Sequence, residues 1–262
     1  MRETSPSVHL VARPALDLAG MRAYLEAAGG AGWLDRRLEE SGGDPNPGEL
    51  LVEFAGRACY RSWEPGLNPN VTRVRTDQRE YFENLLRSAH GSVLEHASYS
   101  FALRDVSRVF THELVRHRAG SAFSQESLRY VRLSEIGFRV PPALEPIRDQ
   151  VVAIVERLEE LQVDAAASLG LDDDGVPFEV KKEVTSALRR LAPIGLSTDI
   201  IWTANVRTLR HVIEMRTAPG AEEELRLVFR QVGALMRAEA PALFQDFVED
   251  ADGAWVPAYR KV

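Results

Sequence analysis

The sequence contains a single cysteine, Cys59, among its 262 residues. One cysteine forms neither an intramolecular disulfide nor a zinc site built from several thiolates, so both kinds of stabilisation are excluded. Its scarcity also fits a reducing compartment. Cys59 lies in an apolar stretch with helical spacing. We expect it to be a small buried core residue with no nucleophilic role.

Long apolar runs are missing as well. Apolar runs such as 200–202 fall far short of the roughly 20 residues that a membrane-spanning helix needs. Residues 1–6 lack the apolar core that drives secretion. With 45% hydrophobic and 27% charged residues, the composition is that of an ordinary globular protein. We therefore expect a cytoplasmic protein that does not contact membranes.

Lysine is rare: only Lys181, Lys182 and Lys261 occur among 32 basic residues, and arginine supplies the rest. The net charge of −7 argues against a broad nucleic-acid-binding face, because backbone phosphates must be met by clustered cations. Small anions are still candidate ligands. Arginine suits them, since its planar guanidinium binds phosphate and carboxylate groups with two hydrogen bonds.

Several catalytic motifs are absent. The chain has no Gly-x-Ser-x-Gly element and no phosphate-binding Gly-x-x-x-x-Gly-Lys-Ser/Thr loop, which weakens hydrolase and ATPase interpretations. His112 and His117 are five residues apart, whereas two zinc-binding histidines on one helix are four apart. At about 100° per residue, a spacing of five residues turns the second side chain about 140° away from the first. No metal site is predicted.

Hydrophobic periodicity predicts a mixed α+β fold, with many helices around a mixed or antiparallel sheet, in a single domain over 1–262. Alternating residues predict a strand at 98–103, and β-branched and aromatic residues predict one at 198–203. Short strands are also expected at 8–12 and 138–140. Helical spacing predicts helices at 16–40, 49–60, 77–88, 108–116, 146–169, 180–191, 206–215 and 219–247, and Ser107 is the expected N-cap of the fourth.

The densest polar segment is Arg116-His117-Arg118, followed by a Gly/Ser-containing stretch, 119–126. A helix that ends in arginines and passes into such a loop presents guanidinium groups, hydroxyls and backbone amides together, which predicts an anion pocket. A solvated basic helix end is the alternative, because cations are favourable near a helix C-terminus.

A second arginine-rich segment lies in the C-terminal half. It contains Arg189, then Asn205, Arg207 and His211 in one helical stretch, and finally Arg216. A surface salt-bridge stripe has a similar pattern. An asparagine at a helix start together with repeated arginines nevertheless favours a planar ligand rich in hydrogen-bonding groups, such as a nucleobase, a flavin or a phosphate.

Together and in this order, these segments resemble the flavin-dependent thymidylate synthase family. Its Arg-His-Arg signature followed by a serine is matched by Arg116-His117-Arg118 and Ser127, with one residue more between them than the family usually has. We place the extra residue within 119–122. The other matching segments are Ser127-x-Arg129-Tyr130, His90-Gly-Ser-x-x-Glu95-His96, Arg189-x-x-x-Pro193 and Trp202-Thr-x-Asn205-x-Arg207-x-Leu209-x-His211-x-x-x-x-Arg216.

The resemblance implies a residue set for each ligand. Arg216 matches the arginine that contacts the pyrimidine carbonyl and stabilises charge on the ring. The matches for the nucleotide phosphate are Ser127, Arg129 and Arg189, and Glu113 and Gln125 match positions that face the sugar. The FAD-binding matches are Ser92, Glu95, Arg116, His117, Arg118, Asn205, Arg207 and His211, with His90 close to the flavin.

It also implies a reaction: methylene transfer from methylenetetrahydrofolate to C5 of dUMP, with hydride from reduced FAD and NADPH as the reductant. The expected assembly is a homotetramer with shared active sites. Two alternatives stay open. One is the same chemistry on UMP, as in a branch that serves nucleoside-antibiotic synthesis, and the other is a nucleotide-binding module without turnover.

Overall fold

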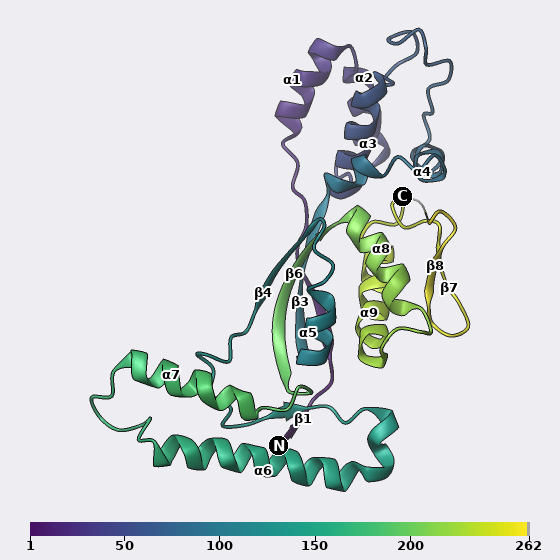
Figure 1. Ribbon diagram of the computed structural model, residues 1–262. Helices are drawn as coiled ribbons and strands as arrows, with labels where there is room; N and C mark the ends of the chain where they lie inside the picture. Colours follow the sequence, from purple (N-terminus) through teal and green to yellow (C-terminus); the bar gives the residue numbers. More distant parts are fainter. Residues whose placement is uncertain (261–262) are drawn as a thin grey trace.

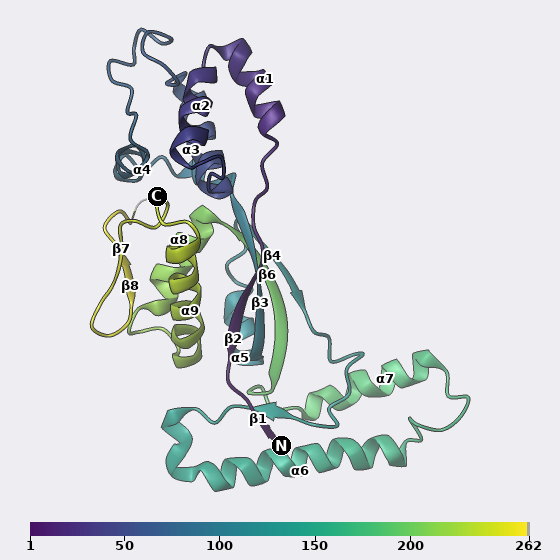
Figure 2. The ribbon, with the colours of Figure 1, turned by 180° about the vertical axis from the view of Figure 1, so that it is seen from behind.

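The computed structural model describes residues 1–260, and a four-stranded antiparallel sheet forms its centre (Figure 1). The strand order is β2 (Ser7–Ala12), β3 (Ser98–Ser107), β6 (Ser197–Asn205) and β4 (Ser121–Gln125). Figure 2 shows β2 and β4 at the two edges. The first three confirm the strands predicted at 8–12, 98–103 and 198–203. The fourth, β4, lies in the stretch that we expected to be a loop, so that prediction was wrong.

The main hydrophobic core lies between this sheet and two helices, α8 (Val206–Thr217) and α9 (Glu223–Glu239). Tyr99, Phe101 and Leu103 of β3 are buried, as their alternation predicts. Trp202 of β6 meets Phe229 of α9 edge to face, with 5.6 Å between ring centroids. This packing fixes the end of β6 and the start of α8, which contribute residues to the lining of a cavity.

The remaining elements surround this centre. The helices are α1 (Leu18–Ala28), α2 (Ala31–Glu40), α3 (Pro47–Tyr60), α4 (Gln78–Arg87), α5 (Arg108–Leu114), α6 (Arg148–Ser168) and α7 (Phe178–Leu188). Short 3-10 helices span Gly91–Glu95, Pro142–Ile147 and Arg189–Leu191. The short strands are β1 (Arg2–Glu3), which pairs with β5 (Gly137–Phe138), and β7 (Phe247–Glu249), which pairs with β8 (Trp255–Pro257).

Several predicted helices have different bounds, and three of them show the physical reason. The helix expected over 16–40 is two helices, because Gly29 adopts a left-handed φ of 79° and a Cβ on Gly30 would lie 2.6 Å from the Trp63 ring. The last helix ends at Glu239, just before Pro241. The helix expected over 108–116 ends at Leu114, although its N-cap, Ser107, is confirmed by a 3.0 Å hydrogen bond from the Phe110 amide.

The molecule is elongated (Figure 1). Helices α6 and α7 form an arm at the end that holds the N-terminus, and α1 to α4 lie at the opposite end. Each end has its own small hydrophobic cluster, one around Ile136 and Val155 and the other around Trp33 and Trp63. The arm still exposes large apolar side chains, because Ile154 is 63% and Phe178 is 64% accessible.

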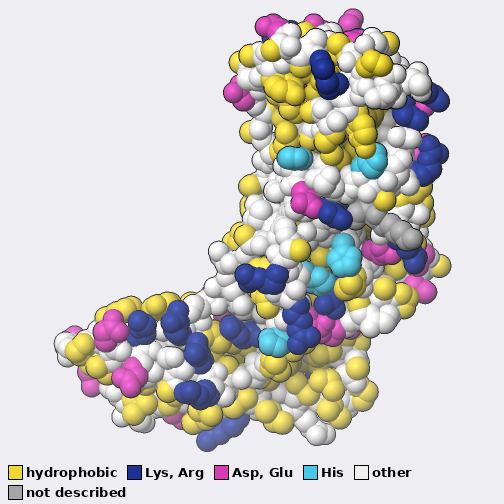
Figure 3. Space-filling view, turned by 45° about the horizontal axis from the view of Figure 1, so that its top comes forward, with side chains coloured by type: hydrophobic (Ala, Val, Ile, Leu, Met, Phe, Trp, Pro, Cys, Tyr) yellow, Lys and Arg dark blue, Asp and Glu magenta, His cyan; other side chains and the backbone are white. Residues whose placement is uncertain are grey.

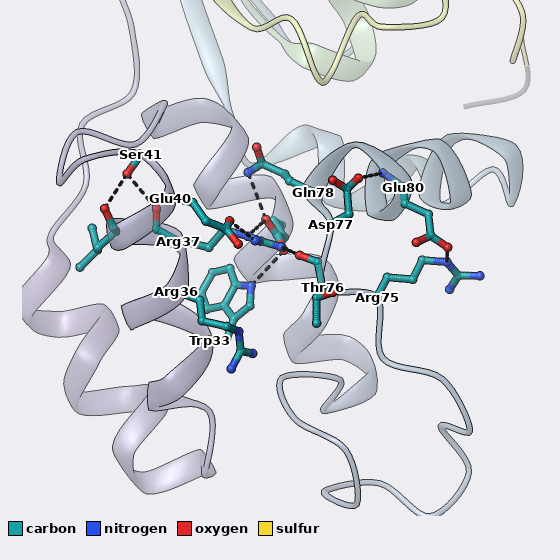
Figure 4. Close-up of polar contacts among 12 residues, drawn as sticks. Trp33, Arg36, Arg37, Glu40, Ser41, Arg75, Thr76, Asp77, Gln78 and Glu80 are labelled. Carbon is teal, nitrogen blue, oxygen red and sulfur yellow. Dashed lines mark hydrogen bonds and ion pairs between the residues drawn. The ribbon is translucent and has the colours of Figure 1, made fainter.

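A buried ionic cluster holds the α1–α4 end together (Figure 4). The fully buried Glu53 carboxylate accepts hydrogen bonds from Trp33, Arg37 and Arg57 at 2.8–2.9 Å. The two arginines also donate to the backbone carbonyls of residues 75 and 76, so they tie the irregular segment 61–77 to the helices. Burial raises the pKa of Glu53, but the two guanidinium groups outweigh it and bring this pKa below its usual value.

No helix within residues 1–260 combines the length and the apolar character needed to span a membrane. In the same part of the chain, no three His, Cys, Asp or Glu side chains are grouped as metal ligands would be.

Candidate functional site

The Arg116-His117-Arg118 segment lies on a turn between α5 and β4. Gly120 completes this turn with a φ of 66°, and its carbonyl accepts a 3.0 Å hydrogen bond from the Asn205 amide. A Cβ at Gly120 would lie 2.4 Å from Asn205 Nδ2, so glycine is needed for this close approach. The three side chains are therefore held by a turn attached to the sheet, and not by a helix end as the sequence suggested.

The junction of β6 and α8 faces this turn. Asn205 is the N-cap of α8, and its Oδ1 accepts a 2.9 Å hydrogen bond from the Thr208 amide. The Thr208 hydroxyl donates to the Ala119 carbonyl at 2.7 Å. The side-chain amide nitrogen of Asn205 makes no hydrogen bond within residues 1–260, so it can donate to a ligand. The first arginine-rich segment of the sequence thus meets the 205–211 part of the second one here.

Between these segments lies a cavity of about 630 Å³, which we call the central cavity. It is lined by Glu95, Arg116, His117, Arg118, Gly120, Asn205, Arg207, Thr208 and His211, among others. This set contains all the predicted cofactor-binding residues except His90 and Ser92. Those two line a neighbouring cavity of about 570 Å³, the outer cavity, and Arg207 lines both.

The central cavity is rich in hydrogen-bond donors. Within residues 1–260, Arg116 and Arg118 have no carboxylate partner, whereas Arg207 pairs with Glu95 at 2.6 Å. Figure 3 shows Lys, Arg and His side chains gathered on this face from the middle of the molecule to the arm. Unpaired guanidinium groups beside a backbone turn suit a phosphate-bearing ligand.

Arg216, in the last turn of α8, links two elements. Its Nε donates to His117 Nε2 at 2.9 Å, and its Nη1 lies 2.8 Å from Glu113 Oε2 on α5. Burial, together with the charges of Arg216 and His211, lowers the pKa of His117 to about 4. The imidazole is therefore neutral at pH 7, as it must be to accept the hydrogen bond from Arg216.

Another face of α5 lines a third cavity, of about 440 Å³, which we call the α5 cavity. Its lining includes Arg108, Thr111, His112, Gln125, Leu128, Arg189 and Arg190. Two predicted substrate-binding residues, Gln125 and Arg189, are thus brought together although they are distant in sequence. Several arginines and the absence of a lining carboxylate make this cavity a candidate anion site.

The other predicted substrate residues do not line this cavity. Ser127 and Arg129 flank the lining residue Leu128, and the Ser127 hydroxyl accepts a weak 3.4 Å hydrogen bond from the Arg129 amide. The Arg129 guanidinium lies 5.4 Å from the centre of the Tyr130 ring. Glu113 lies on the side of α5 that meets Arg216.

The structure adds Arg108 to the candidates. Its Nη1 is buried without a hydrogen-bond partner within residues 1–260, and burial and the neighbouring Arg189 lower the pKa of the guanidinium. A buried, unpartnered cation is costly, so an anion is expected there. The sequence gives only a weak sign of this role. Arg108 directly follows the N-cap Ser107, and that position indicates the start of a helix.

The outer cavity adds two more residues. The Tyr60 ring stacks on His90, with 5.5 Å between centroids and 19° between planes, and the Tyr60 hydroxyl lies 3.4 Å from His90 Nε2. Cys59 lines the same cavity and is exposed, so the prediction of a buried cysteine was wrong. The reason is its place near the C-terminal end of α3, on the side that the core does not cover.

Comparison with known proteins agrees with this arrangement. A family model described as thymidylate synthase complementing protein matches residues 44–242. Flavin-dependent thymidylate synthases of Mycobacterium marinum and Mycobacterium tuberculosis are each 36% identical over 209 residues, which cover 78% of this chain and 81% of theirs.

A crystal structure of the UMP/dUMP methylase PolB from Streptomyces cacaoi, bound with 5-Br UMP, matches 98% of this chain and 100% of its own. The TM-score is 0.61 and the sequence identity is 20%, so this likeness concerns the fold. The matched family model, the identity to the mycobacterial enzymes and the residues around the central cavity lead to one conclusion: the chain belongs to the flavin-dependent thymidylate synthase family.

Proposed function

We propose that the protein is an FAD-dependent enzyme that methylates C5 of the uracil ring of dUMP to give dTMP. Methylenetetrahydrofolate is the proposed carbon donor and NADPH the proposed reductant. Family membership supports the chemistry. The observation that carries the proposal is the pair of contacts that Arg216 makes. One is with His117, which lines the arginine-rich central cavity, and the other is with Glu113 on α5, the helix that also lines the α5 cavity.

The residues of the central cavity fit FAD. Arg116 and Arg118, which have no carboxylate partner within the described residues, would bind its diphosphate, and the Asn205 amide nitrogen is free to donate to a flat heterocycle. When bound, FAD supplies the hydride for the reaction. The flavin would also meet His90 through the outer cavity, because Arg207 lines both cavities.

The α5 cavity fits the nucleotide. Arg108 and Arg189 would hold its phosphate, and Gln125 would face its sugar. The uracil ring would then lie toward Arg216, whose guanidinium stabilises negative charge that develops on the pyrimidine carbonyl. The neutral imidazole of His117 and the carboxylate of Glu113 hold that guanidinium in place from two sides. The positive charge of Arg216 is therefore oriented before the substrate binds.

The ribonucleotide UMP is the second candidate substrate. The similar fold of a UMP/dUMP methylase is compatible with it, and so is the extra residue of the signature, which we place within 119–122, around the start of β4. The two substrates differ only in the 2′-hydroxyl. Gln125, the residue proposed to face the sugar, ends this same strand.

A single experiment tests the proposal. Purified protein is incubated anaerobically with FAD, NADPH and methylenetetrahydrofolate, and the products from dUMP and from UMP are identified by mass spectrometry. Preferential formation of dTMP supports the proposed function, and preferential formation of 5-methyl-UMP supports the alternative. If FAD is bound but neither product forms, the protein is a binding module and the enzyme proposal fails.

We also propose that the active protein is a homotetramer whose active sites are shared between subunits. The support from the structure is the arm of α6 and α7, which exposes large apolar side chains along much of its length. A monomer rarely leaves so many apolar side chains in water, whereas an assembly buries them.

A further inference from the structure

Thr111 of α5 and Gln125 of β4 form a side-chain hydrogen bond at the wall of the α5 cavity. Gln125 Nε2 lies 3.0 Å from Thr111 Oγ1. Thr111 is 3% exposed, Gln125 is half-buried, and both residues line the cavity. The resemblance to the family assigns Gln125 to the sugar but assigns nothing to Thr111.

The polarity of this bond is set by a second contact. The Thr111 hydroxyl donates its proton to the Arg108 carbonyl at 3.3 Å, and a carbonyl only accepts. The hydroxyl oxygen therefore has only acceptor capacity left for Gln125. The side-chain amide must turn its NH2 group toward Thr111, and its carbonyl oxygen, Oε1, is directed away from that contact.

Gln125 Oε1 makes no hydrogen bond within residues 1–260, whereas the charged groups of the cavity are guanidinium donors. Anionic parts of a ligand will bind those donors. The acceptor Oε1 suits a neutral group that donates a proton. On a nucleotide held by its phosphate, a sugar hydroxyl is such a group.

We propose that Thr111 is a positioning residue for substrate binding: it fixes the side chain of Gln125 so that Oε1 accepts a hydrogen bond from a sugar hydroxyl of the uracil nucleotide. The inference rests on the proposed function, because it takes a uracil nucleotide as the ligand. Thr111 acts only through Gln125 and has no contact with the substrate in this proposal.

The test uses Thr111→Val, which keeps the shape of the side chain and removes the hydroxyl. Valine leaves the Gln125 NH2 group facing a methyl group, so the amide is free to turn or move away. Thr111→Ser, which keeps the hydroxyl, is the matched control. A midpoint of thermal unfolding within a few degrees of the wild type shows that each variant is folded.

Dissociation constants are measured by calorimetry for UMP, dUMP and 2′,3′-dideoxy-UMP, which has no sugar hydroxyl. We expect the wild-type protein and Thr111→Ser to bind the hydroxyl-bearing nucleotides about ten-fold more tightly than the dideoxy compound, which corresponds to about 1.4 kcal/mol. Thr111→Val should lose most of this preference. In a Gln125→Ala background, Thr111→Val should have no further effect.

Two results would overturn the inference while the proposed function survives: an unchanged preference in Thr111→Val, or additive effects of the two substitutions. If the wild-type protein binds none of the three nucleotides, the proposed function fails, and this inference fails with it.

Discussion

Arg216 Nε donates a hydrogen bond to His117 Nε2 at 2.9 Å, across 99 positions of sequence. The bond joins the last turn of α8 to the turn that follows α5. Because Nη1 is also held by Glu113 at 2.8 Å, the guanidinium is fixed by two elements before any ligand binds. Such preorganisation is what an electrostatic role in catalysis requires.

The first prediction concerns Arg216→Ala. If this arginine stabilises charge on the pyrimidine ring, its loss should lower kcat about 100-fold or more, as loss of one preorganised donor does in other enzymes. Flavin should stay bound, because Arg216 does not line the central cavity. Turnover and the flavin absorbance per subunit are measured together. Arg22→Ala, which removes a surface pair with Asp35, is the control.

A different result would contradict the assigned role. If Arg216→Ala loses its flavin while each remaining flavin works at the normal rate, the residue binds the cofactor and does not act on the substrate.

The second prediction concerns pH. The pKa of His117 is lowered to about 4, so the ring stays neutral and accepts the Arg216 hydrogen bond down to about pH 5. Activity should then fall as pH drops through about 4, and not near 6.5, where a free histidine titrates. The pH profile of kcat and the ring resonances of His117 in NMR spectra are the two measurements.

His117→Gln supplies an acceptor that does not titrate. In this variant, the fall in activity that protonation of His117 causes in acid should disappear or move to lower pH. An acid limb near pH 6.5 that is the same in both proteins would show that the imidazole of His117 does not control activity.

Sequence patterns predicted local features well. The alternation of Tyr99, Phe101 and Leu103 predicted β3, and Ser107 predicted the start of α5. Both signals depend on neighbouring residues alone. In contrast, β4 consists mainly of small polar and apolar residues, and its strand conformation comes from pairing with β6, which the local sequence does not encode.

The candidate site shows the same division. The arginine-rich segments were recognised from the sequence, and the structure brings them together around the central cavity. Arg108 was missed because its candidate role in anion binding depends on a cavity that it shares with Arg189, which lies 81 positions away in the sequence. A contact of this kind follows from the register of the sheet and the packing of α5, and no local pattern reports it.

The third prediction concerns Arg108. Its buried, unpartnered Nη1 points to a phosphate contact, so Arg108→Ala should raise KM for the nucleotide about ten-fold or more while kcat changes little. Inhibition by inorganic phosphate should weaken in parallel. Arg104→Ala, four residues earlier on the exposed part of β3, should change neither value. An equal effect of both substitutions would indicate a general loss of positive charge in place of a specific contact.

The fourth prediction concerns the arm. Ile154→Glu and Phe178→Glu place charges on exposed apolar positions of α6 and α7, so each should disrupt a tetramer that buries these helices. Light scattering coupled to size exclusion measures the mass. Val248→Glu is the matched control, since Val248 is 66% exposed but lies on β7, away from the arm. Unchanged assembly in both arm variants would place the interface elsewhere.

The fifth prediction concerns Glu53, which lies fully buried between Arg37 and Arg57. Glu53→Gln leaves the buried Arg57 guanidinium without a carboxylate partner and leaves Arg37 paired only with the exposed Glu40, so we expect it to lower the free energy of unfolding by about 3–5 kcal/mol at pH 7. Urea denaturation measures this loss. Glu80→Gln, which removes an exposed carboxylate paired with Arg73, should cost less than about 1 kcal/mol.

The pH dependence of that loss identifies its origin. Because the pKa of Glu53 is lowered on folding, its charge stabilises the protein above the pKa of the unfolded chain, about 4.3, and this contribution is lost as pH falls through the lower folded value. The difference between wild type and Glu53→Gln should therefore shrink in acid. A difference that stays constant over the whole range would mean that the carboxamide disturbs packing, and that the ion pairs contribute little to the stability of this end of the molecule.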